Sequence, residues 1–189
     1  MRPALTPSQT VGPFFALGLT PQAGGYALRD LAGPETCGPE APGQRIRVVG
    51  EVLDGDGLAI PDALVEIWQA DADGKFPGAG AHPRFQGFAR SATTGEGFAF
   101  TTVRPGSVGA GHAPHIALIV FMRGLLAHVC TRLYFADDAQ ANAVDPVFAA
   151  VPRERRETLL ARLVASDEPP TWRFDIRMQG PGETVFFDI

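Results

Sequence analysis

The sequence predicts an all-β protein, a β-sandwich with a long N-terminal arm and one late helix. The chain has 189 residues, 45% of them hydrophobic and 13 of them phenylalanine, enough to fill the core of one domain. Its 22 glycines and 17 prolines indicate many turns and short elements. Segments that alternate apolar and polar residues recur between turn sequences, as they do in a sandwich.

Residues 1–44 are predicted to form an arm with loops, and residues 45–189 the sandwich domain. The arm contains Gly12-Pro13, Gly24-Gly25 and Gly38-Pro39, a density of chain breakers that forbids a long helix or a central strand. From Arg45 onward the sequence alternates, so the sheet is expected to begin there.

Seven segments of the sandwich domain are predicted to be strands. They are residues 45–52, 63–67, 98–102, 115–122, 125–135, 172–178 and 184–189. The fourth and fifth are nearly continuous apolar runs hinged at Arg123-Gly124, which predicts a buried pair of strands. Periodicity alone is also compatible with a helix there, and the β-branched residues favour strands.

The late helix is predicted at residues 153–165. This segment lacks Gly and Pro, and it places Leu159, Leu160, Leu163 and Val164 on one stripe opposite charged residues.

Composition and charge exclude several classes of function. The net charge is −5 and no run of Lys or Arg occurs, so neither a nucleic acid nor an anionic membrane is an expected partner. Cys37 and Cys130 lie far apart without a C-x-x-C spacing, which predicts reduced thiols without a role in zinc binding or thiol exchange. The N-terminus has no apolar signal region and no stretch approaches 18 apolar residues, so we expect a cytoplasmic protein.

The residue types alone do not reveal a reaction centre. The four histidines are His82, His112, His115 and His128, and no two have the spacing of metal ligands on one face of a helix or strand. The sequence has no G-x-S-x-G elbow, no phosphate-binding glycine loop and no paired Cys/His motif. On these grounds the chain is a scaffold without its own reaction centre.

Several motifs taken together resemble the intradiol ring-cleavage dioxygenases. Val-Glu-Ile-Trp-Gln-Ala-Asp-Ala-Asp-Gly at residues 65–74 is followed by Phe-Ala-Arg at 88–90 and Gly-Phe-Ala-Phe-Thr-Thr-Val at 97–103. Pro-His-Ile at 114–116, Thr-Arg-Leu-Tyr-Phe at 131–135 and the tail at 173–188 extend the likeness to nearly the whole chain. The resemblance implies the β-sandwich of that family.

The resemblance also locates the positions at which catalytic chains of the family bind iron. Those chains hold a non-haem ferric ion with two tyrosinates and two histidines, a donor set suited to a hard metal. Here Phe76 and Val108 match the tyrosines, while His115 and Ala117 match the histidines. Because only His115 among these four residues has an atom that can coordinate a metal ion, this chain is expected to bind no metal. Phe76 and Val108 then become ordinary packing residues, and His115 a hydrogen-bonded strand residue in a filled-in former site.

This pattern is similar to that of the iron-free alpha chains of two-chain members of the family. The resemblance implies that a beta subunit binds Fe(III) and that the pair cleaves protocatechuate with O2, between its hydroxylated carbons, to 3-carboxy-cis,cis-muconate. This reaction belongs to aromatic catabolism through the β-ketoadipate pathway. The expected partners are therefore the beta subunit, in a hetero-oligomer of alpha-beta pairs, and the aromatic substrate.

The resemblance further implies that this chain contributes residues to the partner's substrate pocket. Thr10, Gly12 and Pro13 match the alpha-chain segment at that pocket, and Phe14 stands where that segment often has Tyr. Arg132 matches an alpha-chain arginine near the bound substrate. The alternative for the arm is a merely flexible terminus, which would leave the apolar side chains of Val11, Phe14 and Phe15 in water. The alternative for Arg132 is a salt-bridged strand residue.

Two alternatives stay open at this point. The first is a stand-alone transthyretin-like sandwich that serves as a binding module without catalysis. The second is a divergent homomeric dioxygenase with other ligands, for which the sequence shows no donor cluster.

Overall fold

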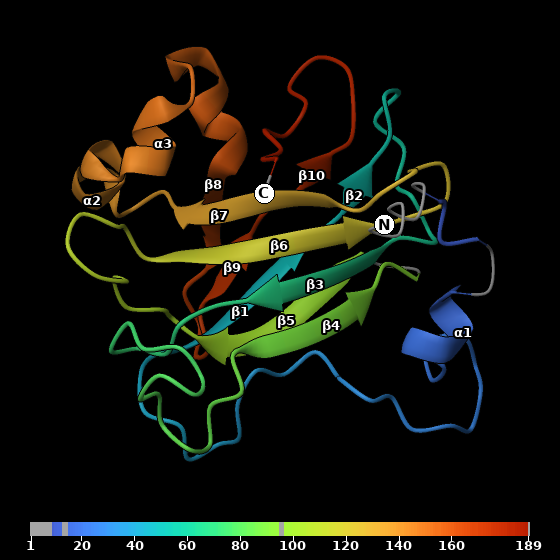
Figure 1. The fold of residues 1–189 in the computed structure, drawn as a ribbon, viewed down its shortest axis with the longest axis horizontal. Coiled ribbons are helices and arrows are strands. Elements are labelled where there is room, and N and C mark those ends of the chain that lie inside the picture. The colour runs from blue at the N-terminus through green and yellow to red at the C-terminus, as the bar shows by residue number, and fades with distance from the viewer. Residues whose placement is uncertain (1–8, 13–14, 95–96, 189) are drawn as a thin grey trace, which may run out of the picture.

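The computed structural model describes residues 9–12, 15–94 and 97–188, and in them strands predominate (Figure 1). The strands are β1 (Arg45–Gly50), β2 (Val52–Leu53), β3 (Leu64–Trp68), β4 (Phe88–Ala92), β5 (Phe98–Val103), β6 (His115–Phe121), β7 (Val129–Phe135), β8 (Leu160–Ala165), β9 (Thr171–Arg173) and β10 (Ile176–Arg177). The helical elements are α1 (Phe15–Leu19), α2 (Ala139–Val144), α3 (Pro146–Ala150) and the 3-10 helix η1 (Arg153–Leu159). No helix in this part of the chain is long and apolar enough to cross a membrane.

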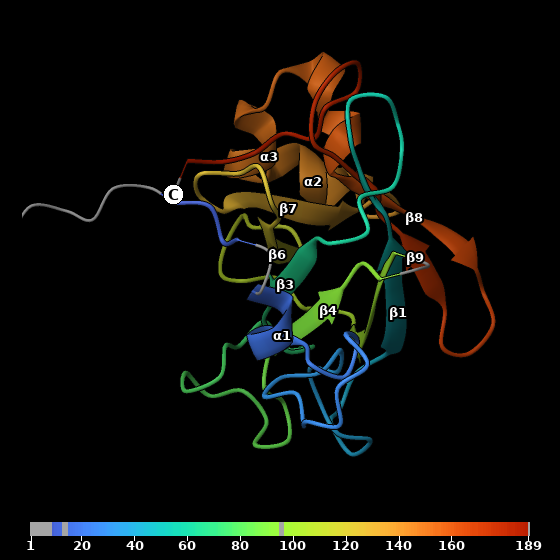
Figure 2. The ribbon, with the colours of Figure 1, turned by 90° about the vertical axis from the view of Figure 1, so that its right-hand side faces the viewer.

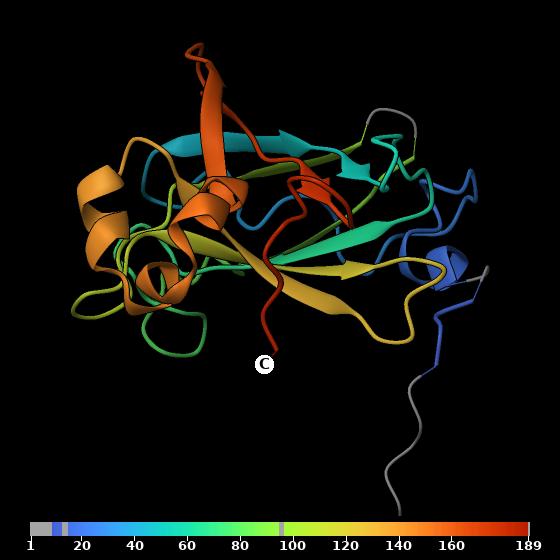
Figure 3. The ribbon, with the colours of Figure 1, turned by 90° about the horizontal axis from the view of Figure 1, so that it is seen from above.

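Eight strands form one sheet, in the order β4-β3-β6-β7-β8-β9-β1-β5. Seen from above, the sheet folds back on itself into two layers, with β8 rising where the layers join (Figure 3). The pairing of β7 with β8 is short and parallel, whereas β6 and β7 pair antiparallel along six residues. The predicted all-β, sandwich-like fold is therefore confirmed, in the form of a nearly closed, barrel-like sheet.

The main core lies between the two layers. It is made of inward-pointing residues from strands of both, including Ile46, Phe98, Phe100, Phe135 and Trp172. The rings of Phe135 and Trp172 meet edge to face, with centroids 5.1 Å apart. Such contact joins β7 in one layer to β9 in the other, and aromatic pairs of this kind add about 0.5–1.5 kcal/mol beyond the area that they bury.

The helix predicted at residues 153–165 is wrong. The segment begins as η1 and continues as β8, which pairs with β7 on one side and β9 on the other. Leu163 and Val164, half of the predicted apolar stripe, are 50% and 56% exposed. Leu159 is buried in a small core cluster and Leu160 packs against it, so the four residues do not form one core-facing helical stripe. The pairing of β8 with two neighbouring strands decides the conformation of this segment instead.

Other predicted boundaries also differ from the structure. The segment at 172–178 divides into β9 and β10, which belong to two different sheets. The tail at 184–188 forms only an isolated bridge between Phe187 and Cys130 and not a strand, and Ile189 lies outside the described residues. Strand β4 and helices α2 and α3 were not predicted.

Residues of the predicted arm contact the sheet at two places (Figure 2). Helix α1 lies beside β4, and Arg90 of β4 donates to the carbonyl of Leu19. Farther along, the Thr36 hydroxyl lies 2.6 Å from that of Thr102, and Cys37 is buried beside Phe85. The end of the arm is thus attached to β5 by a buried hydrogen bond.

Candidate functional site

A cavity of about 440 Å³ lies on the outer face of β3, β6 and β7. It is lined by residues that include Trp68, Phe76, His115, Ala117, Cys130 and Arg132. Three of the four positions that match the iron ligands of catalytic chains therefore meet in one place, together with Arg132. Val108, the fourth, does not line this cavity.

Strand register explains why these residues meet. Trp68 of β3 lies opposite Ala117 of β6, and Ala117 lies opposite Arg132 of β7. His115 is two residues from Ala117 on β6, and Tyr134 is two residues from Arg132 on β7. These two residues also lie opposite each other. Because side chains two apart on a strand point to one face, both rows project from the same side of the sheet.

Phe76 reaches the cavity from the loop that follows β3. Its ring stacks on Trp68, with centroids 5.8 Å apart and planes 8° from parallel. The loop is fixed by the Asp71 carboxylate, which accepts from the backbone N–H groups of Lys75 at 2.9 Å and His82 at 3.1 Å. Gly74 is also required, since its φ is 76° and a Cβ there would lie 2.0 Å from the Ser107 carbonyl oxygen.

His115 is held by the backbone that precedes its strand. Its Nδ1 lies 2.8 Å from the Ala113 carbonyl oxygen, and its ring tilts against that of Tyr134 at 5.6 Å. Burial lowers the pKa of His115 below its ordinary value, and the charge of Arg132 adds to this, against the raising effects of the Ala113 hydrogen bond and Asp145. Near neutral pH the ring is therefore uncharged. Since a carbonyl only accepts, Nδ1 carries the proton and Nε2 is left with a lone pair.

Arg132 belongs to a chain of polar contacts that begins at a buried carboxylate. Asp145, which is fully buried, accepts from the Tyr134 hydroxyl at 3.2 Å and from the backbone N–H groups of Ala113, Val147 and Phe148 at 3.0, 2.9 and 2.9 Å. The Tyr134 oxygen in turn lies 3.5 Å from Arg132 Nη1. Burial, partly opposed by Arg132, raises the pKa of Tyr134 to about 12, so its hydroxyl stays protonated.

These residues do not fit ferric iron. Phe76, Val108 and Ala117 carry no donor atom, and His115 is one ligand where such an ion needs several. Within residues 9–12, 15–94 and 97–188, no three His, Cys, Asp or Glu side chains cluster as they would to hold a metal. The former site is also not filled in, because the cavity persists beside His115.

The arm residues lie elsewhere in this chain. Gln9 and Val11 line a small hollow at the β6–β7 hairpin, with Phe121 and His128, at the end of β6 opposite His115. Thr10 is exposed, and Gly12 has a φ of 75° with no atom of the described chain within 4 Å of a Cβ placed there. Pro13 and Phe14 lie outside the described residues. The structure therefore does not bring Thr10 or Gly12 to the cavity that Arg132 lines.

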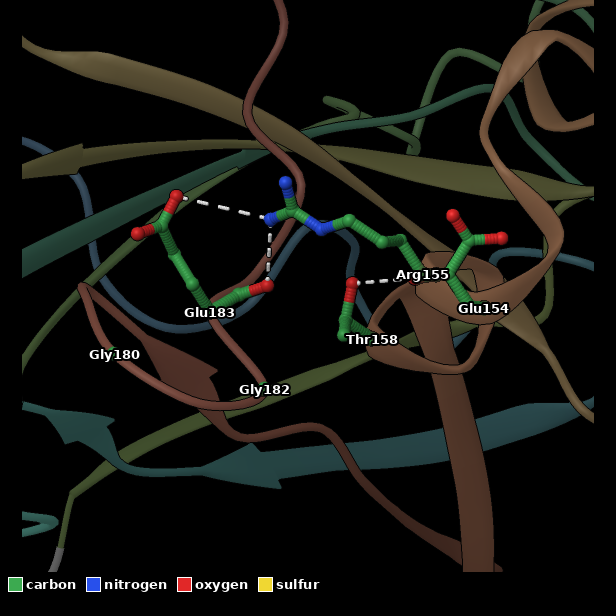
Figure 4. Close-up of a pocket in the computed structure, with 6 residues that line it drawn as sticks. All are labelled: Glu154, Arg155, Thr158, Gly180, Gly182 and Glu183. Carbon is green, nitrogen blue, oxygen red and sulfur yellow. Dashed lines mark hydrogen bonds and ion pairs between the residues drawn. The ribbon is translucent and has the colours of Figure 1, made fainter.

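A second hollow, of about 270 Å³, lies between η1 and the loop that follows β10 (Figure 4). Arg155 crosses it to the Glu183 carboxylate at 3.7 Å and donates to the Glu183 carbonyl at 2.9 Å. The Thr158 hydroxyl donates to the Arg155 carbonyl oxygen at 2.8 Å. Because its cation already has partners within the chain, this hollow offers less to a ligand than the cavity beside His115.

Sequence reasoning did not assign a site role to Trp68, Tyr134 or Asp145. Trp68 carried a usable signal, because it breaks the alternation of β3 and places a large aromatic on the face opposite Ile67. Asp145 followed by Pro146 carried another, since Asp before a proline is typical of a helix start. Tyr134 had none, because its role depends on α3 packing over it.

Comparisons with known proteins agree with this geometry. The family described as Dioxygenase matches residues 22–180. A protocatechuate 3,4-dioxygenase alpha chain from Burkholderia cepacia is 50% identical, covering 97% of this chain and 97% of its own length. The beta chain from the same organism is 33% identical over 77% of this chain and 68% of its own.

Solved structures share the fold at lower identity. An intradiol ring-cleavage dioxygenase from Tetranychus urticae superposes with a TM-score of 0.65 over 96% of this chain and 97% of its own, at 18% identity. At that identity the likeness concerns the fold alone. The family match over most of the chain and the alpha-chain relative together show that this protein belongs to the intradiol ring-cleavage dioxygenase family.

Proposed function

We propose that this chain is the iron-free alpha chain of a two-chain protocatechuate 3,4-dioxygenase. The observation that carries the proposal is the loss of donor atoms at Phe76, Val108 and Ala117 in a chain that is half identical to an alpha chain along 97% of its length. Dioxygenases of this family use Fe(III), and we assign that ion to a beta chain of the kind found in Burkholderia cepacia. The pair would open protocatechuate with O2 to 3-carboxy-cis,cis-muconate in the cytoplasm.

Within the pair, we propose that this chain's part is to shape the substrate pocket of its partner. The arm supports this role, because Thr10 is exposed, Gly12 is partly exposed and Val11 is 37% exposed although it is apolar. Residues at such a position can be covered by a second chain without rearranging the core. Arg132, on the open face of β7, supplies a guanidinium suited to the substrate carboxylate. Thr10, Gly12, Pro13 and Arg132 thus remain our proposed substrate-binding residues.

Co-production with a beta chain tests this proposal. We expect the two chains to purify as one complex that consumes O2 with protocatechuate, and this chain alone to consume none. The matched control is the beta chain produced alone under the same conditions. A stable monomer or homo-oligomer that never pairs with a beta chain would instead support a stand-alone binding module.

A further inference from the structure

Two points of the arm meet the sheet at a single residue, Arg90 of β4. The Arg90 guanidinium donates to the carbonyl oxygen of Leu19, the last residue of α1, at 3.5 Å. The backbone N–H of Arg90 donates to the carbonyl oxygen of Gly33 at 2.9 Å. Both ends of the segment 19–33 are therefore held at one place, and Figure 2 shows α1 beside β4 there.

A carboxylate on the neighbouring strand fixes the direction of the Arg90 side chain. Glu66 of β3 lies opposite Arg90 in the strand register. Both side chains project from the outer face of the sheet, because the adjacent residues Ile67 and Ala89 belong to the main core. Arg90 Nε donates to Glu66 Oε1 at 2.8 Å, and Nη2 donates to the same oxygen. Nη1 is thereby directed toward the arm.

Stability alone does not explain this ion pair, because it is largely buried. The side chains of Arg90 and Glu66 are 13% and 12% exposed. Taking two charges out of water costs about as much as their attraction returns, so an apolar pair of similar volume would stabilise the fold equally well. What an apolar pair cannot supply is a donor held in a fixed direction. Here that donor points at a carbonyl group of the arm.

The anchored end of α1 is close in sequence to the arm residues that we propose at the partner's pocket. Gly12 lies three residues before α1, which begins at Phe15. Thr20 and Pro21, directly after α1, are buried, so the helix is held at its C-terminal end. A segment that is held near its bound position loses less conformational entropy when it binds. The attachment at Arg90 therefore limits where Gly12 can lie before a second chain meets it.

We propose that Arg90, oriented by Glu66, is a positioning residue of the arm. It fixes α1 against β4 and thereby places the arm's proposed substrate-binding residues for the partner's pocket, without touching the substrate itself. The effect on turnover rests on the proposed function. The anchoring of α1 is a property of this chain alone and can be measured without the partner.

Amide hydrogen exchange of the full chain tests the anchor. The paired substitution Glu66→Leu with Arg90→Met removes both charges and leaves no unpaired ion in the sheet. Peptides covering residues 15–26 should then exchange about tenfold faster or more, while peptides from β6 stay unchanged. The matched control is Glu40→Leu with Arg84→Met, which removes an exposed Arg–Glu pair that also joins the arm to the sandwich domain and should leave residues 15–26 unaffected.

Arg90→Lys is a second variant that keeps the buried charge pair. Lysine retains the cation but lacks the guanidinium fork, so it cannot hold the Glu66 carboxylate and the Leu19 carbonyl at the same time. It should loosen residues 15–26 as the paired substitution does. Circular dichroism establishes that each variant is folded.

Kinetics of the two-chain complex test the positioning role. Both variants should raise the KM for protocatechuate about 3–10-fold with kcat unchanged, the scale of the ordering cost of one side chain. Because Arg90 acts through the arm, the same substitutions should not alter KM in a complex whose chain lacks residues 1–15. A general structural effect would be equal with and without those residues.

The two experiments keep this proposal apart from the proposed function. Faster exchange over residues 15–26, with a rise in KM that requires residues 1–15, supports the positioning role. Unchanged exchange in both variants overturns the anchor, whether or not the complex turns over protocatechuate. Faster exchange with an unaltered KM, or an equal rise in the truncated complex, overturns the positioning role. A wild-type complex without turnover contradicts the proposed function, and hydrogen exchange then decides the anchor by itself.

Discussion

Arg132 and Asp145 show how neighbouring groups decide what a charged residue does. Asp145 accepts four hydrogen bonds from Ala113, Val147, Phe148 and Tyr134, and it lies 3.5 Å from His112 Nδ1. The hydrogen-bonding capacity of the Asp145 carboxylate is used inside the protein, so its role is structural. Arg132 has one long contact with a neutral hydroxyl and an open cavity in front of it, so its charge is available to a ligand.

We predict that Arg132→Ala in the assembled enzyme weakens the use of protocatechuate more than that of plain catechol. The difference should be about 1–3 kcal/mol in kcat/KM, the scale of a charge-assisted hydrogen bond to the carboxylate that catechol lacks. Steady-state kinetics on both substrates measure it, with Arg47→Ala as the control for a general effect of lost charge. Equal losses on the two substrates would assign Arg132 to structure.

Asp145→Asn should destabilise the fold by about 1–3 kcal/mol at neutral pH, because an amide replaces a carboxylate that accepts from several buried donors. Burial tends to raise the pKa of Asp145, but the hydrogen bonds from Phe148, Ala113 and Tyr134 outweigh it and leave the pKa lowered. A lowered folded-state pKa means that this stability is present above the unfolded value of about 3.9 and is lost as the pH falls through the folded value.

Urea unfolding of both proteins across a pH series measures this effect. The difference between wild type and Asp145→Asn should be constant near neutral pH and should shrink below about pH 4. A difference that stays constant down to pH 2 would show that the carboxylate charge is not what Asp145 contributes.

At the scale of the element, the errors of sequence reasoning have a common physical cause. The stripe of Leu159, Leu160, Leu163 and Val164 satisfies a helical period, yet β8 forms because β7 and β9 offer backbone partners on both sides. Periodicity reports which side chains share a face and contains no information about distant strands. By contrast, β3, β5 and β6 were predicted close to their observed bounds, since alternation and local turn residues suffice for them.

Arg104 fixes the connection between β5 and the segment that follows β7. Its guanidinium lies 4.3 Å from the Phe135 ring centroid and 4.9 Å from that of Trp172, and it pairs with Asp137 at 2.7 Å and Asp138 at 2.8 Å. The Arg104 side chain is 19% exposed, so screening by water is limited.

We therefore predict that Arg104→Lys lowers the free energy of unfolding by about 1–2 kcal/mol, because lysine cannot bridge two carboxylates while lying flat on two rings. Denaturant unfolding measures it. Arg123→Lys is the matched control, since the Arg123–Asp62 pair is exposed and such pairs contribute about 0–1 kcal/mol. Similar effects of the two substitutions would contradict a special role of Arg104.

The arm gives a second prediction at this scale. Deleting residues 1–15 should leave the sandwich folded, because its core strands begin at Arg45, and it should raise the KM of the complex for protocatechuate. Gly12→Val should raise KM as well. The structure adds backbone strain to the effect of bulk, because the φ of Gly12 is 75°.

Gly12→Asn separates the two causes, since asparagine tolerates a positive φ yet still adds a side chain. If bulk at the partner's pocket matters, both substitutions raise KM with the iron content unchanged. An unaltered KM in Gly12→Asn and in the truncated complex would remove the arm from the site.

At the scale of the whole molecule, local sequence patterns predict the fold class but neither the closure of the sheet nor the cavity. The all-β class followed from turn density and alternation, which are local. The closing of eight strands around one core, with β7 meeting β8 through only two residue pairs, depends on contacts far apart in the chain and was not predicted. The cavity belongs to the same category, because Trp68, Ala117 and Arg132 lie in one row only when three strands take this register.

The last prediction concerns the iron of the assembled protein. This chain purified alone should contain no ferric iron and lack visible tyrosinate-to-iron absorption, because Phe76 and Val108 carry no phenolate and a lone His115 cannot hold the ion. The purified complex should contain one iron per pair of chains, measured by metal analysis beside the absorption spectrum. His115→Ala should leave that content unchanged, since we assign every ligand to the partner. Stoichiometric iron in the isolated chain, or iron lost from the complex on His115→Ala, would require ligands in this chain and so contradict its place as the iron-free partner.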